Sequence, residues 1–141
     1  MKLGWQSGLS NSQQETIDFG IDFSRYIERG DLIALNGDLG SGKTTFTKGV
    51  LQGLKYTGKV TSPTYTMINE YDCLEKIIHI DCYKEKNLGI WLSLGINDYI
   101  DNQDNILIIE WPEMLDKILP SNLINISFKH ISDNQREINL I

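Results

Sequence analysis

Residues 37–44, Gly-Asp-Leu-Gly-Ser-Gly-Lys-Thr, read G-x-x-x-x-G-K-T, the pattern of a phosphate-binding loop. The glycines of such a loop allow tight turns that point successive backbone N–H groups at phosphate oxygens. Lys43 is expected to reach the β- and γ-phosphates, and the hydroxyl group of Thr44 to bind Mg²⁺. A helix opening at Thr44 directs the positive end of its dipole at the same anion. The pattern predicts a site for a nucleoside triphosphate.

The segments on either side of this loop agree with that interpretation. Leu32 to Leu35 form an apolar run typical of a buried strand. Apolar residues then recur at helical spacing after the loop: Phe46, Val50, Leu51 and Leu54. A strand, a loop and a helix in this order favour phosphate binding over the bland alternative, a glycine-rich turn that contains an incidental lysine.

Two apolar strands end in a carboxylate, and either could supply a Walker B acid. Residues 76–81 form one strand that ends in Asp81, and residues 106–110 form another that ends in Glu110. An acid in this position binds or orients Mg²⁺, directly or through water. The pattern does not separate Asp81 from Glu110, and both can face the same metal ion.

A third segment, Ser62-Pro63-Thr64-Tyr65-Thr66, follows the predicted loop and helix. Hydroxyl residues around a proline are unsuited to a helix interior. Other nucleotidases place a switch segment here that senses the γ-phosphate, so Thr64 and Thr66 are candidate catalytic residues. The alternative is a plain connector.

The two ends of the chain supply candidate contacts for the base or ribose. Ser12-Gln13-Gln14-Glu15 is a capping box, and it predicts a helix that continues to Glu28 and stops at Gly30. Ser12 and Thr16 could line a base pocket or could only cap this helix. Near the other end, residues 122–129 and 136–141 predict a hairpin around a polar turn, and Arg136 directly follows that turn. We therefore include Arg136 among the candidate nucleotide contacts.

Length and composition predict a single domain over residues 1–141. A hydrophobic content of 40% and a charged content of 23% are those of an ordinary globular protein. The net charge of −6 and the three arginines argue against strong independent binding of nucleic acid, which needs a basic stripe. No segment is long and apolar enough for a bilayer, the first five residues do not resemble a signal peptide, and the two cysteines suit a reducing cytoplasm.

The remaining elements complete an α/β prediction: a P-loop NTPase-like three-layer sandwich whose sheet is mostly parallel and ends in an antiparallel hairpin. A helix is expected over residues 88–100 and a short one over residues 114–119, and residues 1–11 carry a short strand or an arm. His79, Cys73 and Cys82 match no zinc spacing and are expected to be structural. Trp111, directly after Glu110, is left open between packing and a role in the site.

Four segments together resemble the TsaE family of small bacterial P-loop ATPases. The first is the loop itself, continued through Thr45 and Phe46. The others are Ser-Pro-Thr-Tyr-Thr at 62–66, His-Ile-Asp-Cys-Tyr-Lys at 79–84 and Ile-Glu-Trp-Pro-Glu at 109–113. The family usually has arginine where Lys84 stands, a departure that matters if a bidentate contact is made there.

The resemblance implies ATP/ADP and Mg²⁺ as ligands, and a role in making threonylcarbamoyladenosine beside the anticodon of tRNA. It implies two protein partners, TsaB and TsaD, with TsaD performing the transfer and tRNA met through that complex. Thr44 and Glu110 are then expected to bind Mg²⁺, with Asp81, Thr64 and Thr66 near the γ-phosphate. The expected phosphate contacts are Gly40, Ser41, Gly42, Lys43, Thr44 and Thr45, within a loop that begins Gly37-Asp38-Leu39.

Two other functions compete with this one. A small-molecule kinase usually surrounds the phosphates with several basic groups and a lid, and three arginines fit that class poorly. A GTP-dependent switch is disfavoured because no D-x-x-G motif follows a strand and no N-K-x-D motif occurs.

Overall fold

The computed structural model describes residues 5–60 and 67–141, and in this part of the chain seven strands form one sheet. They are β1 (Gly8–Ser10), β2 (Leu32–Asn36), β3 (Ile68–Asp72), β4 (Lys76–Asp81), β5 (Asn105–Glu110), β6 (Ile124–His130) and β7 (Arg136–Leu140). The order across the sheet is β1-β7-β6-β2-β5-β4-β3. The four central strands, β6, β2, β5 and β4, run parallel, and antiparallel strands flank them on both sides.

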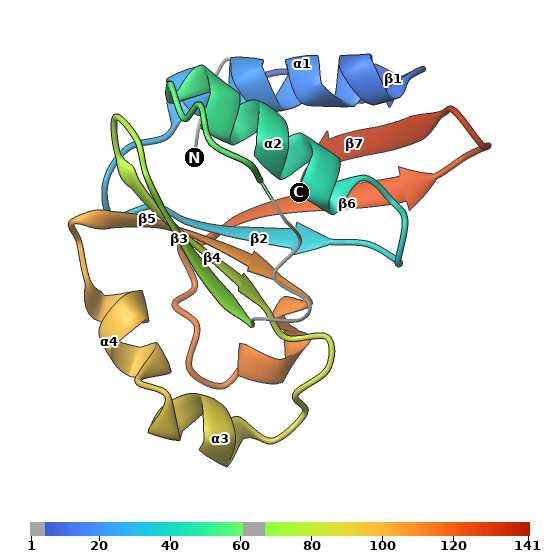
Figure 1. Cartoon of the computed structure of the whole chain (residues 1–141). Helices are drawn as coiled ribbons and strands as arrows, with labels where there is room; N and C mark the ends of the chain where they lie inside the picture. The colour runs from blue at the N-terminus through green and yellow to red at the C-terminus, as the bar shows by residue number, and fades with distance from the viewer. Residues whose placement is uncertain (1–4, 61–66) are drawn as a thin grey trace.

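Two helices cover one face of the sheet: α1 (Gln13–Phe23), extended by a 3₁₀ turn η1 (Ser24–Tyr26), and α2 (Lys43–Gly53) (Figure 1). Alternate residues of the strands point toward them, as the pleat requires. Together they bury the larger core, which includes Ile33 and Leu35 from β2 and Ile106 and Ile108 from β5.

The opposite face is covered by α3 (Leu88–Ser93), α4 (Ile96–Asp101) and the 3₁₀ helix η2 (Pro112–Leu115) (Figure 1). The intervening residues of the same strands, such as Ile78, Ile80 and Leu107, build this second core around the fully buried Trp91. Helices on both faces of a central parallel sheet confirm the predicted three-layer α/β fold, and β6 and β7 form the predicted hairpin.

Some element boundaries differ from the prediction. The helix expected over residues 88–100 is broken, because Gly95 adopts φ +83° and separates α3 from α4. The first helix ends at Phe23, where Ser24 donates a hydrogen bond from Oγ to the Ile21 carbonyl at 2.6 Å and a 3₁₀ turn follows. The helix expected over residues 114–119 is the 3₁₀ helix η2, which begins at Pro112.

The strand β3 was absent from the prediction. It lies at the edge of the sheet, pairs only with β4 among the described strands, and buries only Tyr71. Its mostly polar residues resemble those of a loop, because an edge strand packs little apolar surface and so lacks a strong hydrophobic pattern. At the other edge, β1 confirms a strand within residues 1–11, where it pairs with β7.

Candidate nucleotide-binding site

The loop between β2 and α2 has the backbone conformations that its glycines allow. Gly40 adopts φ +74° and Gly42 φ +104°, values in the left-handed region that other residues rarely adopt. Gly42 caps the amino end of α2, so the first free N–H groups of that helix open onto the loop. A Cβ atom at Gly42 would lie 3.6 Å from Cγ2 of Thr16 and 3.9 Å from Cγ of Arg136. The two ends of the chain therefore meet over this glycine.

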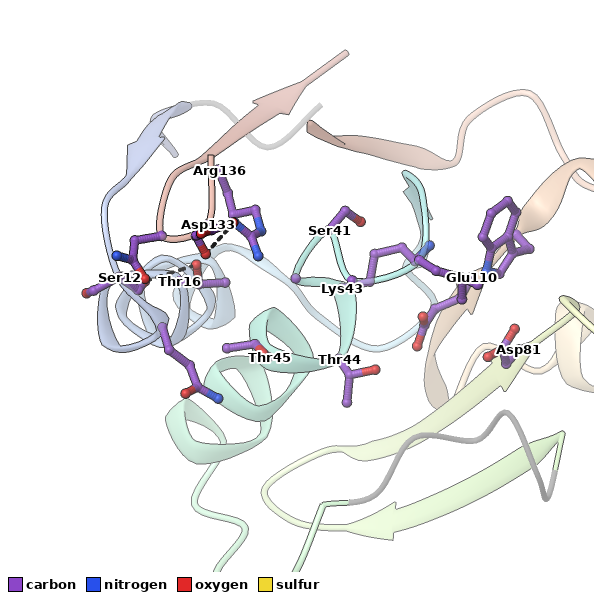
Figure 2. A pocket seen from close by; sticks show the side chains of 16 residues that line it. Ser12, Thr16, Ser41, Lys43, Thr44, Thr45, Asp81, Glu110, Asp133 and Arg136 are labelled. Atoms are coloured by element: carbon purple, nitrogen blue, oxygen red, sulfur yellow. Dashed lines mark hydrogen bonds between the residues drawn. The ribbon is translucent and has the colours of Figure 1, made fainter. Parts of the chain in front are cut away.

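A cavity of about 470 Å³ opens above the loop. Its lining comes from α1, the loop and α2, the carboxyl ends of β4 and β5, and the turn between β6 and β7: Ser12, Gln13, Thr16, Leu39, Gly40, Ser41, Gly42, Lys43, Thr44, Thr45, Asp81, Glu110, Trp111, Asp133, Asn134 and Arg136. Figure 2 shows Ser12, Thr16 and Arg136 gathered at one end, with Asp81 and Glu110 at the other. The loop runs between these ends.

Lys43 lies at the acidic end and is only 5% exposed. Its Nζ donates to the carbonyl of Gly37 and, at 3.4 Å, to that of Asp38, and it lies 4.1 Å from the centre of the Trp111 ring. Burial lowers the pKa of Lys43 below the usual 10.5, and the nearby carboxylates of Glu110 and Asp81 oppose this shift. The lysine is thus a buried cation that contacts two backbone carbonyls and the face of the Trp111 ring, with the carboxylates of Glu110 and Asp81 nearby.

The two candidate acids are neighbours in the sheet. Asp81 and Glu110 are paired residues of β4 and β5, and both lie on the face that α2 covers. Oδ1 of Asp81 accepts a hydrogen bond from the backbone N–H of Tyr83 at 2.8 Å. Glu110 is 3% exposed, and its Oε2 lies 2.6 Å from Nε2 of His79, which is fully buried.

Trp111 follows Glu110 in a left-handed backbone conformation, φ 57° and ψ 57°, which is costly for a bulky residue. This turn brings its ring against Lys43, and against Tyr83 with ring centres 4.9 Å apart. The Trp111 ring therefore forms part of the cavity wall beside the lysine, so Trp111 has a place in the site as well as a packing contact.

The other end of the cavity is built from hydrogen-bonded polar groups. Ser12 caps α1 by accepting the Glu15 N–H at 3.1 Å, as the capping box predicts. Thr16 is buried, with its Oγ1 2.7 Å from Oγ of Ser10. Arg136 donates to the carbonyls of the hairpin turn, at 2.8 Å to that of Ser132 and at 3.3 Å to that of Asp133. Figure 2 draws the contact with Asp133. Donors and acceptors at this end could pair with a base or a ribose.

Most predicted site residues line the cavity, although they come from five separate parts of the chain. Gly37 and Asp38 do not line it and contribute carbonyls to Lys43 instead. Thr64 and Thr66 lie outside the described residues. Sequence reasoning missed Gln13, Asp133 and Asn134. The signal for Gln13 was its place in the capping box, and the turn before Arg136 could have pointed to the other two.

The residues present fit a triphosphate with Mg²⁺. Oγ of Ser41 is buried and has no hydrogen-bond partner among the described residues, so it is an unpaired polar group in the loop. Thr44, Asp81 and Glu110 offer the oxygen ligands that Mg²⁺ prefers. No cluster of three or more His, Cys, Asp or Glu residues capable of holding a metal ion occurs in residues 5–60 and 67–141.

Comparisons with known proteins agree with the fold and identify a family. A family model described as "Threonylcarbamoyl adenosine biosynthesis protein TsaE" matches residues 10–138. The chain is 44% identical over 119 residues, 82% of this chain and 73% of the relative, to the "tRNA threonylcarbamoyladenosine biosynthesis protein TsaE" of Haemophilus influenzae. The protein of the same description from Treponema pallidum is 32% identical over 130 residues, 92% of this chain and 96% of that one.

Among solved structures, a crystal structure of YdiB from Bacillus subtilis superposes with a TM-score of 0.78. The sequences are 31% identical, and the match covers 96% of this chain and 83% of the other. Every helix in the described part of the chain is too short or too polar to cross a bilayer.

Proposed function

The chain belongs to the TsaE family of tRNA threonylcarbamoyladenosine biosynthesis proteins, and from this premise we propose that it binds and hydrolyses ATP, with Mg²⁺, in that pathway. The observation that carries the proposal is the convergence on one cavity of the phosphate-binding loop, Lys43 and the paired acids Asp81 and Glu110. Loop, cation and acids are the parts that phosphoryl transfer to water needs, because its catalysis is mostly positioning and charge neutralisation.

Each residue has a distinct role in this proposal. The backbone N–H groups of residues 40–45 and the amino end of α2 bind the phosphates. Lys43 leaves its carbonyl partners and neutralises charge at the β- and γ-phosphates. Thr44 and Glu110 would hold Mg²⁺, and Asp81 would orient the attacking water. The metal supplies positive charge at the transferred phosphoryl group.

The adenosine is held at the opposite end of the cavity. Thr16 and Arg136 flank Gly42 from either side, which leaves the base and ribose space between α1 and the hairpin turn. Ser12 and Gln13 lie at the exposed mouth of this space, together with Asp133 and Asn134. Their amide, hydroxyl and carboxylate groups can donate to and accept from a nucleoside.

The position of the arginines supports a slow ATPase that needs its partners. Arg25 is exposed and pairs with Asp22, Arg29 pairs with Glu75, and Arg136 is bonded to its own turn at the nucleoside end. The three arginines therefore make their contacts away from Asp81 and Glu110, whereas Lys43 faces both acids. A partner that supplies a second cation would raise the rate, as arginine fingers do. By family resemblance we propose TsaB and TsaD as these partners, with tRNA bound through them.

The test is phosphate release from ATP by the purified protein, alone and with its TsaB and TsaD partners. Partner-stimulated release that is lost in Lys43→Ala and in Glu110→Gln supports the proposal, with a loss of about 10² or more in rate. Loss in Asp81→Asn alone would assign the metal to Asp81. Binding of ATP without release under any condition would make the protein a nucleotide-gated binding module, and release only with a small acceptor would make it a kinase.

A further inference from the structure

His79 occupies a position in β4 that packing alone does not explain. Its side chain is fully buried, while the other internal positions of this strand are filled by isoleucines at 77, 78 and 80. A buried polar side chain costs free energy unless its hydrogen-bonding groups are paired. An apolar residue would avoid that cost, so the presence of an imidazole at this position requires an explanation other than packing.

The polar contacts of the ring identify that reason. Nε2 lies 2.6 Å from Oε2 of Glu110, and Nδ1 has no hydrogen-bond partner among the described residues. Because an ionised carboxylate only accepts hydrogen bonds, the proton of a neutral ring lies on Nε2 and Nδ1 carries the lone pair. The single hydrogen bond found for this imidazole is therefore the one to Glu110.

This hydrogen bond restricts how Glu110 can act. Glu110 lies at the end of β5 and lines the cavity, where Figure 2 shows its carboxylate between Lys43 and Asp81. Because Oε2 is hydrogen-bonded to His79 of the neighbouring strand β4, Oε1 is the carboxylate oxygen that remains available to a ligand in the cavity. Carboxylates that bind metals are commonly fixed in this way by a second group behind them.

We propose that His79 is a positioning residue, which holds Glu110 so that one carboxylate oxygen faces the Mg²⁺ site. The inference rests on the proposed function, because it needs Glu110 to bind the metal. It assigns to His79 a role beyond the structural one expected from sequence. The proposed effect of His79 is on the orientation of the carboxylate.

The experiment uses two conservative variants that differ in where they place a donor. In His79→Gln the amide nitrogen is as many bonds from Cβ as Nε2, so it can reach Glu110. In His79→Asn the amide nitrogen replaces Nδ1 and falls short. Binding of a fluorescent methylanthraniloyl ATP analogue is titrated over a range of Mg²⁺ concentrations, and again with the metal chelated. Ile78→Ala, which opens the opposite core, is the control for lost stability.

His79→Asn is expected to need about 10- to 100-fold more Mg²⁺ for the same tightening of nucleotide binding. His79→Gln and Ile78→Ala stay close to the wild type, and metal-free binding is the same in all. An unchanged Mg²⁺ requirement in His79→Asn, or an equal rise in His79→Gln, would overturn the proposal. A wild type whose nucleotide binding ignores Mg²⁺ would instead refute the proposed function.

A measurement on the unmodified protein keeps the idea testable if His79→Asn does not fold. Nitrogen NMR of the wild type should show the His79 ring protonated on Nε2, with resonances that move when Mg²⁺ is added to the nucleotide complex. A ring protonated on Nδ1, or one that is insensitive to the metal, would count against the inference.

Discussion

At the scale of single residues, Lys43 is an unfavourably placed charge in the ligand-free binding site. The ammonium group is buried, and the lowered pKa means that burial outweighs the attraction of Glu110 and Asp81. Its hydrogen bonds go to backbone carbonyls of its own loop. A phosphate would offer the same cation a full charge, so the ligand-free protein holds Lys43 in a state that nucleotide binding improves.

Lys43→Met is therefore expected to raise the stability of the ligand-free protein at neutral pH. Because the pKa of Lys43 is lower in the folded protein than in the unfolded chain, the unfolded chain binds more protons between these values, and the stability of the wild type rises with pH there. The advantage of Lys43→Met is thus greatest below the pKa that Lys43 has in the folded protein, and it disappears as pH approaches 10.5. Urea unfolding at neutral and alkaline pH measures it. Lys48→Met, on the same helix but outside the cavity, is the control for the loss of a lysine from α2.

Gly42→Ala tests the backbone of the loop. A Cβ atom there would make only ordinary contacts, at 3.6 Å and 3.9 Å, so the cost is that of φ +104° for a residue with a side chain. We expect a loss of about 1–2 kcal/mol in stability. If the loop relaxes to relieve this strain, its N–H groups turn away from the phosphates, and nucleotide affinity falls about tenfold or more. Calorimetric titration with ATP measures the affinity, and wild-type affinity in this variant would contradict the prediction. Gly89→Ala, at an exposed position of α3, is the control.

At the scale of elements, α1 and α2 approach so closely that only glycine fits at their crossing. A Cβ atom at Gly49 would lie 2.1 Å from the Ile17 carbonyl oxygen, and one at Gly20 would lie 2.2 Å from that of Phe46. This contact holds the amino end of α1, with Ser12 and Thr16, against the loop that begins α2. Packing of the two helices therefore determines the width of the nucleoside end of the cavity.

Gly49→Ala is expected to cost about 1–3 kcal/mol through overpacking, and to weaken ATP binding by moving α1 away from the loop. Gly20→Ala should act through the same contact, so the double variant should cost less than the sum of the two single variants. Thermal unfolding with and without ATP measures both effects. Additive losses would show that the two glycines act separately.

At the scale of the whole molecule, one sheet separates two hydrophobic cores that have different roles. The core under α1 and α2 supports the site, and the other core packs α3, α4 and η2 around Trp91. Cys82 lies in this second core, directly after Asp81, and is fully buried. Burial raises the pKa of the Cys82 thiol to about 12 and also raises that of Cys73, which is only partly buried.

Cys82 should therefore report on opening of the fold. At mildly alkaline pH, below its pKa, a thiol reagent should modify Cys73 first and reach Cys82 only when the protein unfolds. In a Cys73→Ser variant, Mg²⁺ and ATP at 100 times the dissociation constant should slow the reaction of Cys82 about 100-fold, because ligand binds the folded state alone. The rate of thiol modification with and without ligand is the measurement. Modification of Cys82 as fast as Cys73 in the native protein would contradict this.

The sequence by itself determined the features that depend on neighbouring residues. The glycine spacing of the loop, the cap at Ser12 and the apolar strands that end in Asp81 and Glu110 are short-range signals of backbone freedom, hydrogen bonding and burial. The α/β class and the C-terminal hairpin followed from them. The sequence did not predict the edge strand β3, because an exposed strand has only a weak hydrophobic pattern. It did not predict the helix break at Gly95 either, because a single glycine within an apolar run is not a specific signal of a left-handed turn.

Only the tertiary structure decided which side chains meet. The pairing of β4 with β5 placed Asp81 beside Glu110, and the same register brought His79 to the Glu110 carboxylate. Thr16 and Arg136, from opposite ends of the chain, flank Gly42 because α1 and the hairpin converge there. Register and helix packing are set by burial summed over the whole chain, and so no local pattern can reveal them.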